Sequence, residues 1–223
     1  MNQDRMESNN SSNFIVINDI IPEAIYDIRY YTDYNFVGER IDGYEEPLAI
    51  LTKECANILK DISKELLNKG YKLKIYDAYR PVKAVDHFLR WSKDLDDARM
   101  KEYFYPNFDK KYLFEQGFLK KNSTHSRGST IDLTLVDAKT NEDIDMGGTF
   151  DFFGDISLPD YELLTKEQKE NRKLLKETML KHGFKQSKLE WWHYTLIDEP
   201  YKDTYFTFPI NRKSISNKKT TIL

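Results

Sequence analysis

The first half of the chain shows a clear helical pattern followed by a clear strand pattern. Apolar residues recur at helical spacing over residues 52–69, with Thr52 placed to cap the helix and Gly70 placed to end it. Residues 71–77 alternate between apolar and polar side chains, which predicts a half-buried strand. Pro81 suits the first turn of the next helix. The buried faces predicted for the two helices are Cys55, Ala56, Leu59, Ile62 and Leu66, and Val82, Val85, Phe88 and Leu89.

The second half adds two strands and one helix. A strand is expected over residues 129–136, where Ile131, Leu133 and Leu135 face one way and Thr130, Asp132 and Thr134 the other. Asp132 is thus expected on a polar strand face that could line a site. Thr165 and Gln168 have the spacing of a capping box, which predicts the start of a helix that Gly183 ends. A last strand is expected over about residues 189–197.

These elements predict an α+β fold. Helices and strands are interspersed without regular βαβ spacing, which favours a single domain whose central sheet is mostly antiparallel and flanked by helices. Residues 1–13 are polar and rich in Asn and Ser, so we expect a disordered N-terminal tail. The folded domain is expected over residues 14–208, and residues 209–223 are expected to form a basic C-terminal tail.

Composition narrows the possible partners. The 223 residues contain 34 Lys and Arg against 37 Asp and Glu, a formal net charge of −3, which argues against nucleic acid as a partner. The single cysteine, Cys55, permits no internal disulfide and no thiolate metal cluster. No apolar run is long enough to cross a membrane and the first residues lack a signal-peptide pattern, so we expect a cytoplasmic protein without a membrane partner.

The four histidines can be sorted by their surroundings. His182 precedes Gly183 at the predicted end of a helix, where a cation suits the helix dipole, and His87 lies within an amphipathic helix, where packing is favoured. His125 and His193 remain. Seven residues separate His125 from Asp132, and spacing alone favours two unrelated surface residues. Two imidazoles and one carboxylate would nevertheless form a three-ligand zinc site with one open position, as in catalytic centres.

Two further charged residues are candidates for catalysis. Glu190 is close to His193 in sequence and could serve as a general base. In a regular strand the two side chains would point to opposite faces, so Glu190 must lie in the turn before the strand or at a bulge. Arg80 follows the end of a predicted strand, where it either stabilises an oxyanion or pairs with a surface carboxylate.

Two short motifs carry a resemblance to a known family. They are Ser123-x-His125-x-x-Gly128-x-Thr130-x-Asp132 and Glu190-x-Trp192-His193. This pattern resembles the zinc signature of metallopeptidases that cleave D-Ala-D-Ala, and within them the D-alanyl-D-alanine dipeptidases of the VanX type. Further matches in the family's order extend the resemblance over residues 26–197 and include Asp27-Ile28-Arg29-Tyr30, Asp77-Ala78-Tyr79-Arg80-Pro81 and Phe150-Asp151.

The resemblance implies a zinc site at the sheet, with one Zn²⁺ per chain, and hydrolysis of D-Ala-D-Ala to two D-alanines. It implies these roles: His125, Asp132 and His193 as zinc ligands, Glu190 as general base, Arg80 as oxyanion stabiliser, and Tyr30, Ser123 and Asp151 as the groups that hold the ends of the dipeptide. One position departs from the family pattern, because Thr130 replaces a frequent Ala on the same strand face as Asp132.

Two other functions remain open from the sequence. A related D,D-carboxypeptidase or cell-wall endopeptidase would use the same zinc centre in a more open cleft. A non-catalytic zinc-dependent binding module would use the metal only to hold the fold, and it would have no use for Glu190 beside an open coordination position. The same hydrolysis could serve glycopeptide resistance or the recycling of wall fragments.

Overall fold

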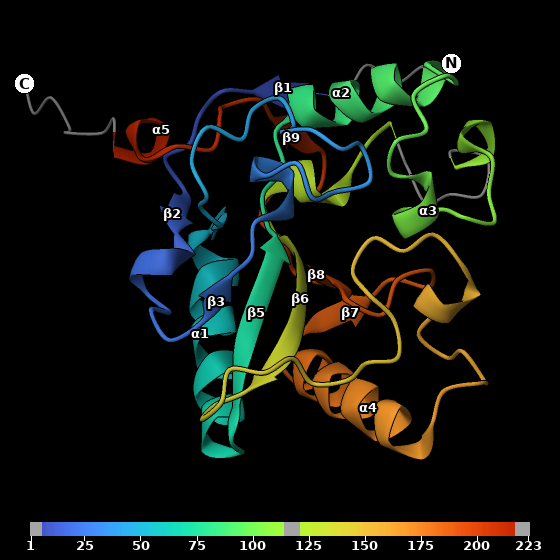
Figure 1. Cartoon of the computed structure of the whole chain (residues 1–223). Coiled ribbons are helices and arrows are strands. Elements are labelled where there is room, and N and C mark those ends of the chain that lie inside the picture. The colour runs from blue at the N-terminus through green and yellow to red at the C-terminus, as the bar shows by residue number, and fades with distance from the viewer. Residues whose placement is uncertain (1–5, 114–120, 217–223) are drawn as a thin grey trace, which may run out of the picture.

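A five-stranded sheet runs through the middle of the protein (Figure 1). Its strands in spatial order are β3 (Ile25–Tyr26), β5 (Tyr71–Asp77), β6 (Thr130–Asp137), β8 (His193–Leu196) and β7 (Phe184–Gln186). β3 and β5 are parallel, and the three other neighbouring pairs are antiparallel. The predicted α+β domain with a mostly antiparallel central sheet is therefore confirmed. This computed structural model describes residues 6–113 and 121–216.

Helices flank the sheet close to where the sequence places them. α1 (Lys53–Asn68) contacts β5, and Gly70 follows it with a left-handed φ of 88°. α4 (Lys166–Lys181) contacts β7, and the predicted capping box at its start is present. α2 (Val82–Lys93) begins directly after Pro81. α1 buries the apolar face expected of it, including the fully buried Cys55. On α2, Val82, Val85 and Phe88 are buried as expected, whereas Leu89 is only partly buried.

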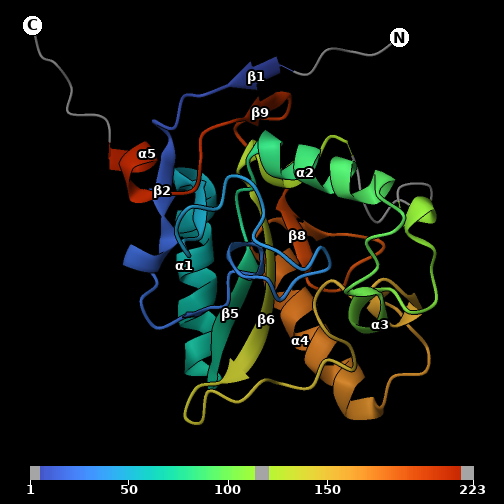
Figure 2. The same ribbon diagram turned by 45° about the horizontal axis from the view of Figure 1, so that its top comes forward.

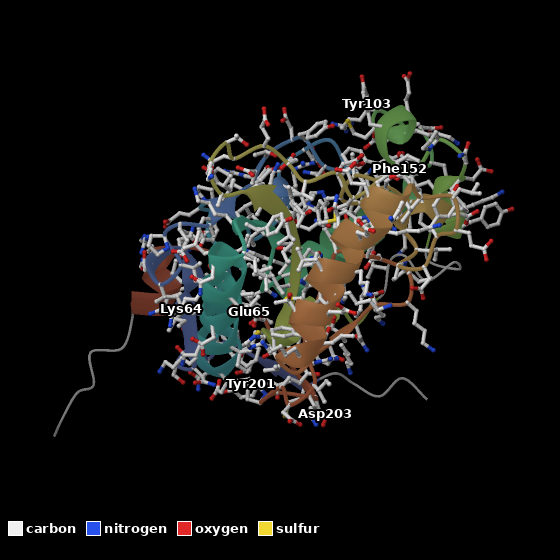
Figure 3. The ribbon with its side chains drawn as sticks, turned by 90° about the horizontal axis from the view of Figure 1, so that it is seen from below. Lys64, Glu65, Tyr103, Phe152, Tyr201 and Asp203 are labelled. Carbon is white, nitrogen blue, oxygen red and sulfur yellow. The ribbon has the colours of Figure 1, made fainter. Side chains whose placement is uncertain are left out.

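α1 and α4 are joined at their C-terminal ends by one carboxylate. Glu65 of α1 accepts hydrogen bonds from Lys69, which directly follows α1, from Lys181 of α4 and from the following His182, each at 2.8–2.9 Å. Figure 3 shows Glu65 between the two helices, whereas the neighbouring Lys64 points away from them. The contact fixes two flanking helices that lie far apart in the sequence.

The two ends of the chain are more ordered than their composition predicts. β1 (Met6–Ser8) pairs in parallel with β9 (Thr204–Phe206), and the two strands lie side by side in Figure 2. The prediction of disorder is therefore wrong for residues 6–8, because backbone pairing does not require apolar side chains. Residues 1–5 lie outside the described residues.

The expected C-terminal tail also contains structure. Phe208 and Ile210 are buried, and α5 (Arg212–Ser216) follows them. The tail is therefore packed against the domain at least as far as residue 211, while residues 217–223 lie outside the described part. The remaining elements are β2 (Phe14–Val16), β4 (Ile50–Thr52), α3 (Lys101–Phe104) and the 3₁₀ helices Ile17–Asp19, Arg29–Tyr31, Lys110–Tyr112, Thr124–Arg127 and Asp155–Ser157.

The length and polarity of the helices decide whether any of them could cross a membrane. Among residues 6–113 and 121–216, none of the helices has the length and apolar character needed to cross a bilayer.

Candidate active site

Three neighbouring strands bring acidic and imidazole side chains into one row. Asp132 in β6 pairs with Asp77 at the end of β5 on one side and with His193 at the start of β8 on the other. The register between β5 and β6 shifts between Ile75 and Asp77, which places the last residue of β5 opposite Asp132. All three side chains are mostly buried. The polar face predicted for β6 therefore lies inside the protein.

His125 reaches the same place from a tight turn that precedes β6. The turn is the 3₁₀ helix Thr124–Arg127, and Ser123 caps it by accepting a hydrogen bond from the His125 backbone N–H. Gly128 ends the turn with a φ of 82°, and a Cβ at this position would lie 2.1 Å from the Phe14 ring. Only glycine fits there, because both the left-handed φ and the close approach exclude a side chain.

The ligand atoms of His125, Asp132 and His193 all lie within 4.8 Å of one another. Nε2 of His125 is 3.1 Å from Oδ2 of Asp132, and Nδ1 of His193 is 3.0 Å from Oδ1. The two imidazole nitrogens are 3.2 Å apart. The structure therefore brings together the three residues that the resemblance implies, whereas spacing alone favoured two unrelated surface residues for His125 and Asp132. This group could hold a metal ion.

The hydrogen bonds around this group suit a metal. Nδ1 of His125 donates to the Ala78 carbonyl at 2.7 Å, which leaves the lone pair of Nε2 directed toward the group. Nε2 of His193 lies 3.4 Å from the Thr124 hydroxyl, so Nδ1 is its inward atom. Oδ1 of Asp132 is buried and accepts no hydrogen bond from the described residues. A buried carboxylate oxygen in that state is suited to bind a cation.

The charges around the group favour binding of a cation. Burial lowers the pKa of His125, which favours its neutral imidazole. Burial alone would raise the pKa of Asp132, but His125 and His193 outweigh it and hold the pKa below its usual range. For His193, burial is outweighed by the neighbouring Asp132, which raises the pKa. The group therefore attracts a positive charge, which a divalent cation can supply in place of a proton.

Glu190 lies in the turn directly before β8, which is one of the two positions that sequence geometry allowed. Its Oε2 is 3.5 Å from Nδ1 of His193, and its side chain is 17% exposed. Trp191 and Trp192 of the same turn are buried. The carboxylate thus borders the metal-binding group and is not one of its three residues.

Arg80 is held by a buried carboxylate. Its Nε and Nη2 each lie 2.8 Å from Oδ2 of Asp77, and Oδ1 of Asp77 accepts a hydrogen bond of 2.6 Å from the Tyr44 hydroxyl. Nη2 is also 3.5 Å from Oδ2 of Asp132, so the guanidinium borders the metal-binding group. The hypothesis that Arg80 pairs with a surface carboxylate is wrong, because Asp77 is 1% exposed.

Tyr30 and Asp151 form a second polar pair near Arg80. The Tyr30 hydroxyl donates to Oδ2 of Asp151 at 2.8 Å, and the Arg80 guanidinium lies 4.9 Å from the centre of the Tyr30 ring. Asp151 is buried and has a left-handed φ of 60°. Burial, with a further contribution from the charge of Asp132, raises the pKa of Asp151 well above its usual range. This carboxyl would gain from a cationic partner.

The other two histidines lie elsewhere, as the elimination from sequence expected. His87 contacts Glu39 and Asp42, and His182 contacts Glu65. Both histidines lie outside the metal-binding group.

Three residues of the site make contacts that the sequence analysis did not predict. Asp77 orients Arg80, Tyr44 holds Asp77, and Thr124 contacts His193. The i, i+3 spacing of Asp77 and Arg80 could have indicated their contact from the sequence. The contact between Tyr44 and Asp77 depends on the tertiary fold. Thr130, the departure from the family pattern, bonds across the sheet to Thr195 at 2.9 Å instead of contacting a ligand.

Known proteins resemble this chain over most of its length. The peptidase M15 family model, described as D-ala-D-ala dipeptidase, matches residues 10–211. A D-alanyl-D-alanine dipeptidase of Enterococcus faecalis is 40% identical over 198 residues, which is 89% of this chain and 98% of that protein. Dipeptidases of the same description from Enterococcus faecium and Streptomyces coelicolor are each 38% identical and cover 88% and 90% of this chain, and 98% and 99% of their own length.

Proposed function

The chain belongs to the peptidase M15 family of D-Ala-D-Ala dipeptidases and is a metallopeptidase, and on this premise we propose that it hydrolyses D-Ala-D-Ala to two D-alanines with one zinc ion. The strongest support is the convergence of His125, Asp132 and His193 from a turn and two strands. Two imidazoles and one carboxylate are a ligand set that zinc uses in catalytic sites, where a fourth position stays open.

The three ligand residues fit zinc in type and in orientation. When bound, zinc acts as a Lewis acid that polarises the peptide carbonyl and lowers the pKa of a coordinated water from 15.7 to roughly 7. The protein contributes the hydrogen bond from Nδ1 of His125 to Ala78, which fixes the ring and its tautomer.

Glu190 is proposed as the general base. Its carboxylate accepts a proton from the attacking water while the water oxygen bonds to the carbonyl carbon. The same proton then passes to the amide nitrogen as the C–N bond breaks, which releases a neutral amine and returns Glu190 to its charged form. The location of Oε2, 3.5 Å from Nδ1 of His193, supports this role because it lies beside the proposed ligand and not among the three.

Arg80 is proposed to stabilise the oxyanion that forms on the carbonyl oxygen. A cation suits this role only if it is already oriented, because reorganisation during the reaction costs part of the benefit. Asp77 supplies that orientation through its contacts with Nε and Nη2, and the rings of Tyr30 and Phe88 pack against the guanidinium. The buried environment also strengthens the interaction with the developing charge.

Asp151, Tyr30 and Ser123 are proposed to hold the ends of the dipeptide. Asp151 is the natural partner of the substrate ammonium, since that cation would relieve the cost of a buried carboxylate. An N-acylated peptide lacks the ammonium and would leave the Asp151 carboxylate without a cationic partner. Ser123 is placed next to His125, where its hydroxyl accepts from the backbone of that residue.

The proposal is tested by incubating zinc-loaded protein with D-Ala-D-Ala, L-Ala-L-Ala and N-acetyl-D-Ala-D-Ala, and by measuring free alanine by mass spectrometry. We expect cleavage of the first alone. Glu190→Gln serves as the matched variant, which should bind zinc as the wild type does but turn over about 10² to 10⁴ times more slowly. Equal cleavage of the acetylated peptide would favour the carboxypeptidase function, and cleavage of none would favour a binding module.

A further inference from the structure

Arg172 of α4 is a buried cation whose hydrogen bonds go to backbone carbonyls. Its Nε donates to Met146 at 2.6 Å, and Nη1 and Nη2 donate to Leu158 and Ile156 at 2.8 Å each. The residue is 5% exposed, and within the described part of the chain no carboxylate forms an ion pair with it. Burial lowers its pKa to about 10. A buried charge without a counter-ion is costly, so a specific geometric role is expected of it.

The three carbonyls lie at the two ends of one segment, residues 146–158, which we call the Asp151 loop. Met146 begins the loop, while Ile156 and Leu158 end it, and the proposed ammonium-binding residue lies between them. The planar guanidinium has donors in a fixed fork, so it holds the two ends at a set separation. Nothing in a lysine side chain reproduces that fork.

Arg172 also reaches the turn that carries the proposed base. Its guanidinium lies 5.3 Å from the centre of the Trp191 ring, a cation–π distance. The backbone N–H of Trp191 donates to the Ser157 carbonyl in the Asp151 loop at 3.0 Å. Since Glu190 directly precedes Trp191, a single buried side chain connects the loop of Asp151 with the turn of Glu190.

The ligand residues are held by a different set of contacts. His125 is fixed by Ala78 and the Ser123 cap, and Asp132 and His193 are fixed by the register of β6 and β8. α4 instead holds the residue directly before the loop with two more side chains, because Gln168 and Asn171 donate to the side chain and the carbonyl of Asp145. Loss of Arg172 would therefore move the loop without moving the metal-binding group.

We propose that Arg172 is a positioning residue for substrate selection. It sets the place of the Asp151 carboxylate relative to Glu190, and thereby the preference for a dipeptide that carries a free ammonium. The inference rests on the proposed function and adds to it a residue on α4. A displaced Asp151 would lose the ammonium contact, while binding of the rest of the dipeptide would remain.

The test compares Arg172→Lys and Arg172→Gln with Leu175→Ala, a fully buried apolar position on the same helix. Three quantities are measured on the zinc-loaded full chain: the KM for D-Ala-D-Ala, the inhibition constant of propionyl-D-Ala, which lacks the amino group, and the melting temperature. Asp151→Asn serves as the positive control. We expect both Arg172 variants to raise the KM by about tenfold or more, with the inhibition constant of propionyl-D-Ala changed less than about twofold and zinc content unchanged.

Leu175→Ala should lower the melting temperature without changing the ratio of the two constants. The inference is overturned if the Arg172 variants behave as Leu175→Ala does, with lower melting temperature and an unchanged ratio, or if they raise both constants equally. Arg172→Lys retains the charge and decides the outcome where Arg172→Gln does not fold. A wild type inactive on D-Ala-D-Ala overturns the proposed function itself, and this result is seen before any variant is compared.

Discussion

Asp132 and His193 face each other across β6 and β8, and Oδ1 of the aspartate lies 3.0 Å from Nδ1 of the histidine. The pair ties the metal-binding group to the register of the sheet. A slip of one residue in either strand would turn one of the two side chains to the opposite face. Because β6 and β8 are both buried, their apolar residues fix the register between them. The register in turn fixes the distance between the two ligand atoms.

Zinc should stabilise the folded protein markedly. The buried Asp132 has an unsatisfied oxygen beside two imidazoles, and a ligand that binds only the folded state adds about 4 kcal/mol at a thousandfold excess over its Kd. We expect the melting temperature to rise on addition of zinc and to fall after chelation, as followed by scanning calorimetry. Asp132→Asn should abolish the rise, whereas His182→Gln, outside the group, should keep it. A zinc response that survives in Asp132→Asn would contradict the assignment of this ligand.

Arg80→Lys should slow the reaction while leaving the metal in place. Lysine keeps the charge but cannot contact Asp77 through two donors, so the cation would no longer be oriented toward the substrate carbonyl. We expect kcat to fall by about 10² to 10³, the loss typical of an oxyanion donor, with unchanged zinc content. Steady-state kinetics and metal analysis measure the two effects.

Arg90 supplies the matched control for this substitution. It lies on α2, close to Arg80 in sequence, but pairs with the exposed Asp42 at 2.5 Å and has a side chain 61% exposed. Arg90→Lys should leave kcat within about twofold of the wild type, since exposed ion pairs contribute little. If Arg80→Lys retained full kcat as well, Arg80 would have no part in stabilising the oxyanion.

Local sequence signals predicted most of the elements. The capping box of Thr165 and Gln168, the stop at Gly70 and the place of Glu190 in a turn each depend on residues a few positions apart, and each is present in the structure. The same is true of the alternation in β6, because period-2 spacing decides which side chains share a face.

Contacts between distant segments could not be predicted in this way. Thr52 precedes α1 as expected, but its hydroxyl bonds to Ser129, 77 positions away, instead of capping the helix. The pairing of β1 with β9 joins segments almost 200 residues apart, and no side-chain pattern in either marks the partner. The role of Arg172 was hidden for the same reason, since backbone carbonyls leave no trace in the sequence.

Thr130 should matter for stability and not for zinc. Its hydroxyl is buried and bonded only to Thr195 among the described residues, so Thr130→Val would leave the partner hydroxyl unsatisfied at a cost of about 1–3 kcal/mol. The double variant Thr130→Val/Thr195→Val replaces both partners by apolar groups of similar shape and should be nearly neutral. Urea unfolding of the two single variants and the double variant measures this coupling. A change in zinc affinity in Thr130→Val would show instead that the hydroxyl acts on the metal site.

Glu65 should make stability depend on acid pH. Hydrogen bonds from Lys181, Lys69 and His182, in that order, hold the pKa of Glu65 well below its ordinary value of 4.5. A carboxyl whose pKa is lowered by folding contributes stability in full above its unfolded pKa and loses it as pH falls toward the folded pKa. Glu65→Gln should therefore lower the melting temperature at pH 7, and the difference from the wild type should shrink progressively below about pH 4.5.

Asp61 on the same helix is the matched control for Glu65. It pairs with Lys64 three residues away, and both side chains are more than 60% exposed, so Asp61→Asn should change the melting temperature little at any pH. Glu65 differs because it connects α1 to the end of α4, which lies more than a hundred residues further along the chain (Figure 3). An equal and pH-independent loss in both variants would mean that Glu65 acts through general surface charge and not through the contact between the helices.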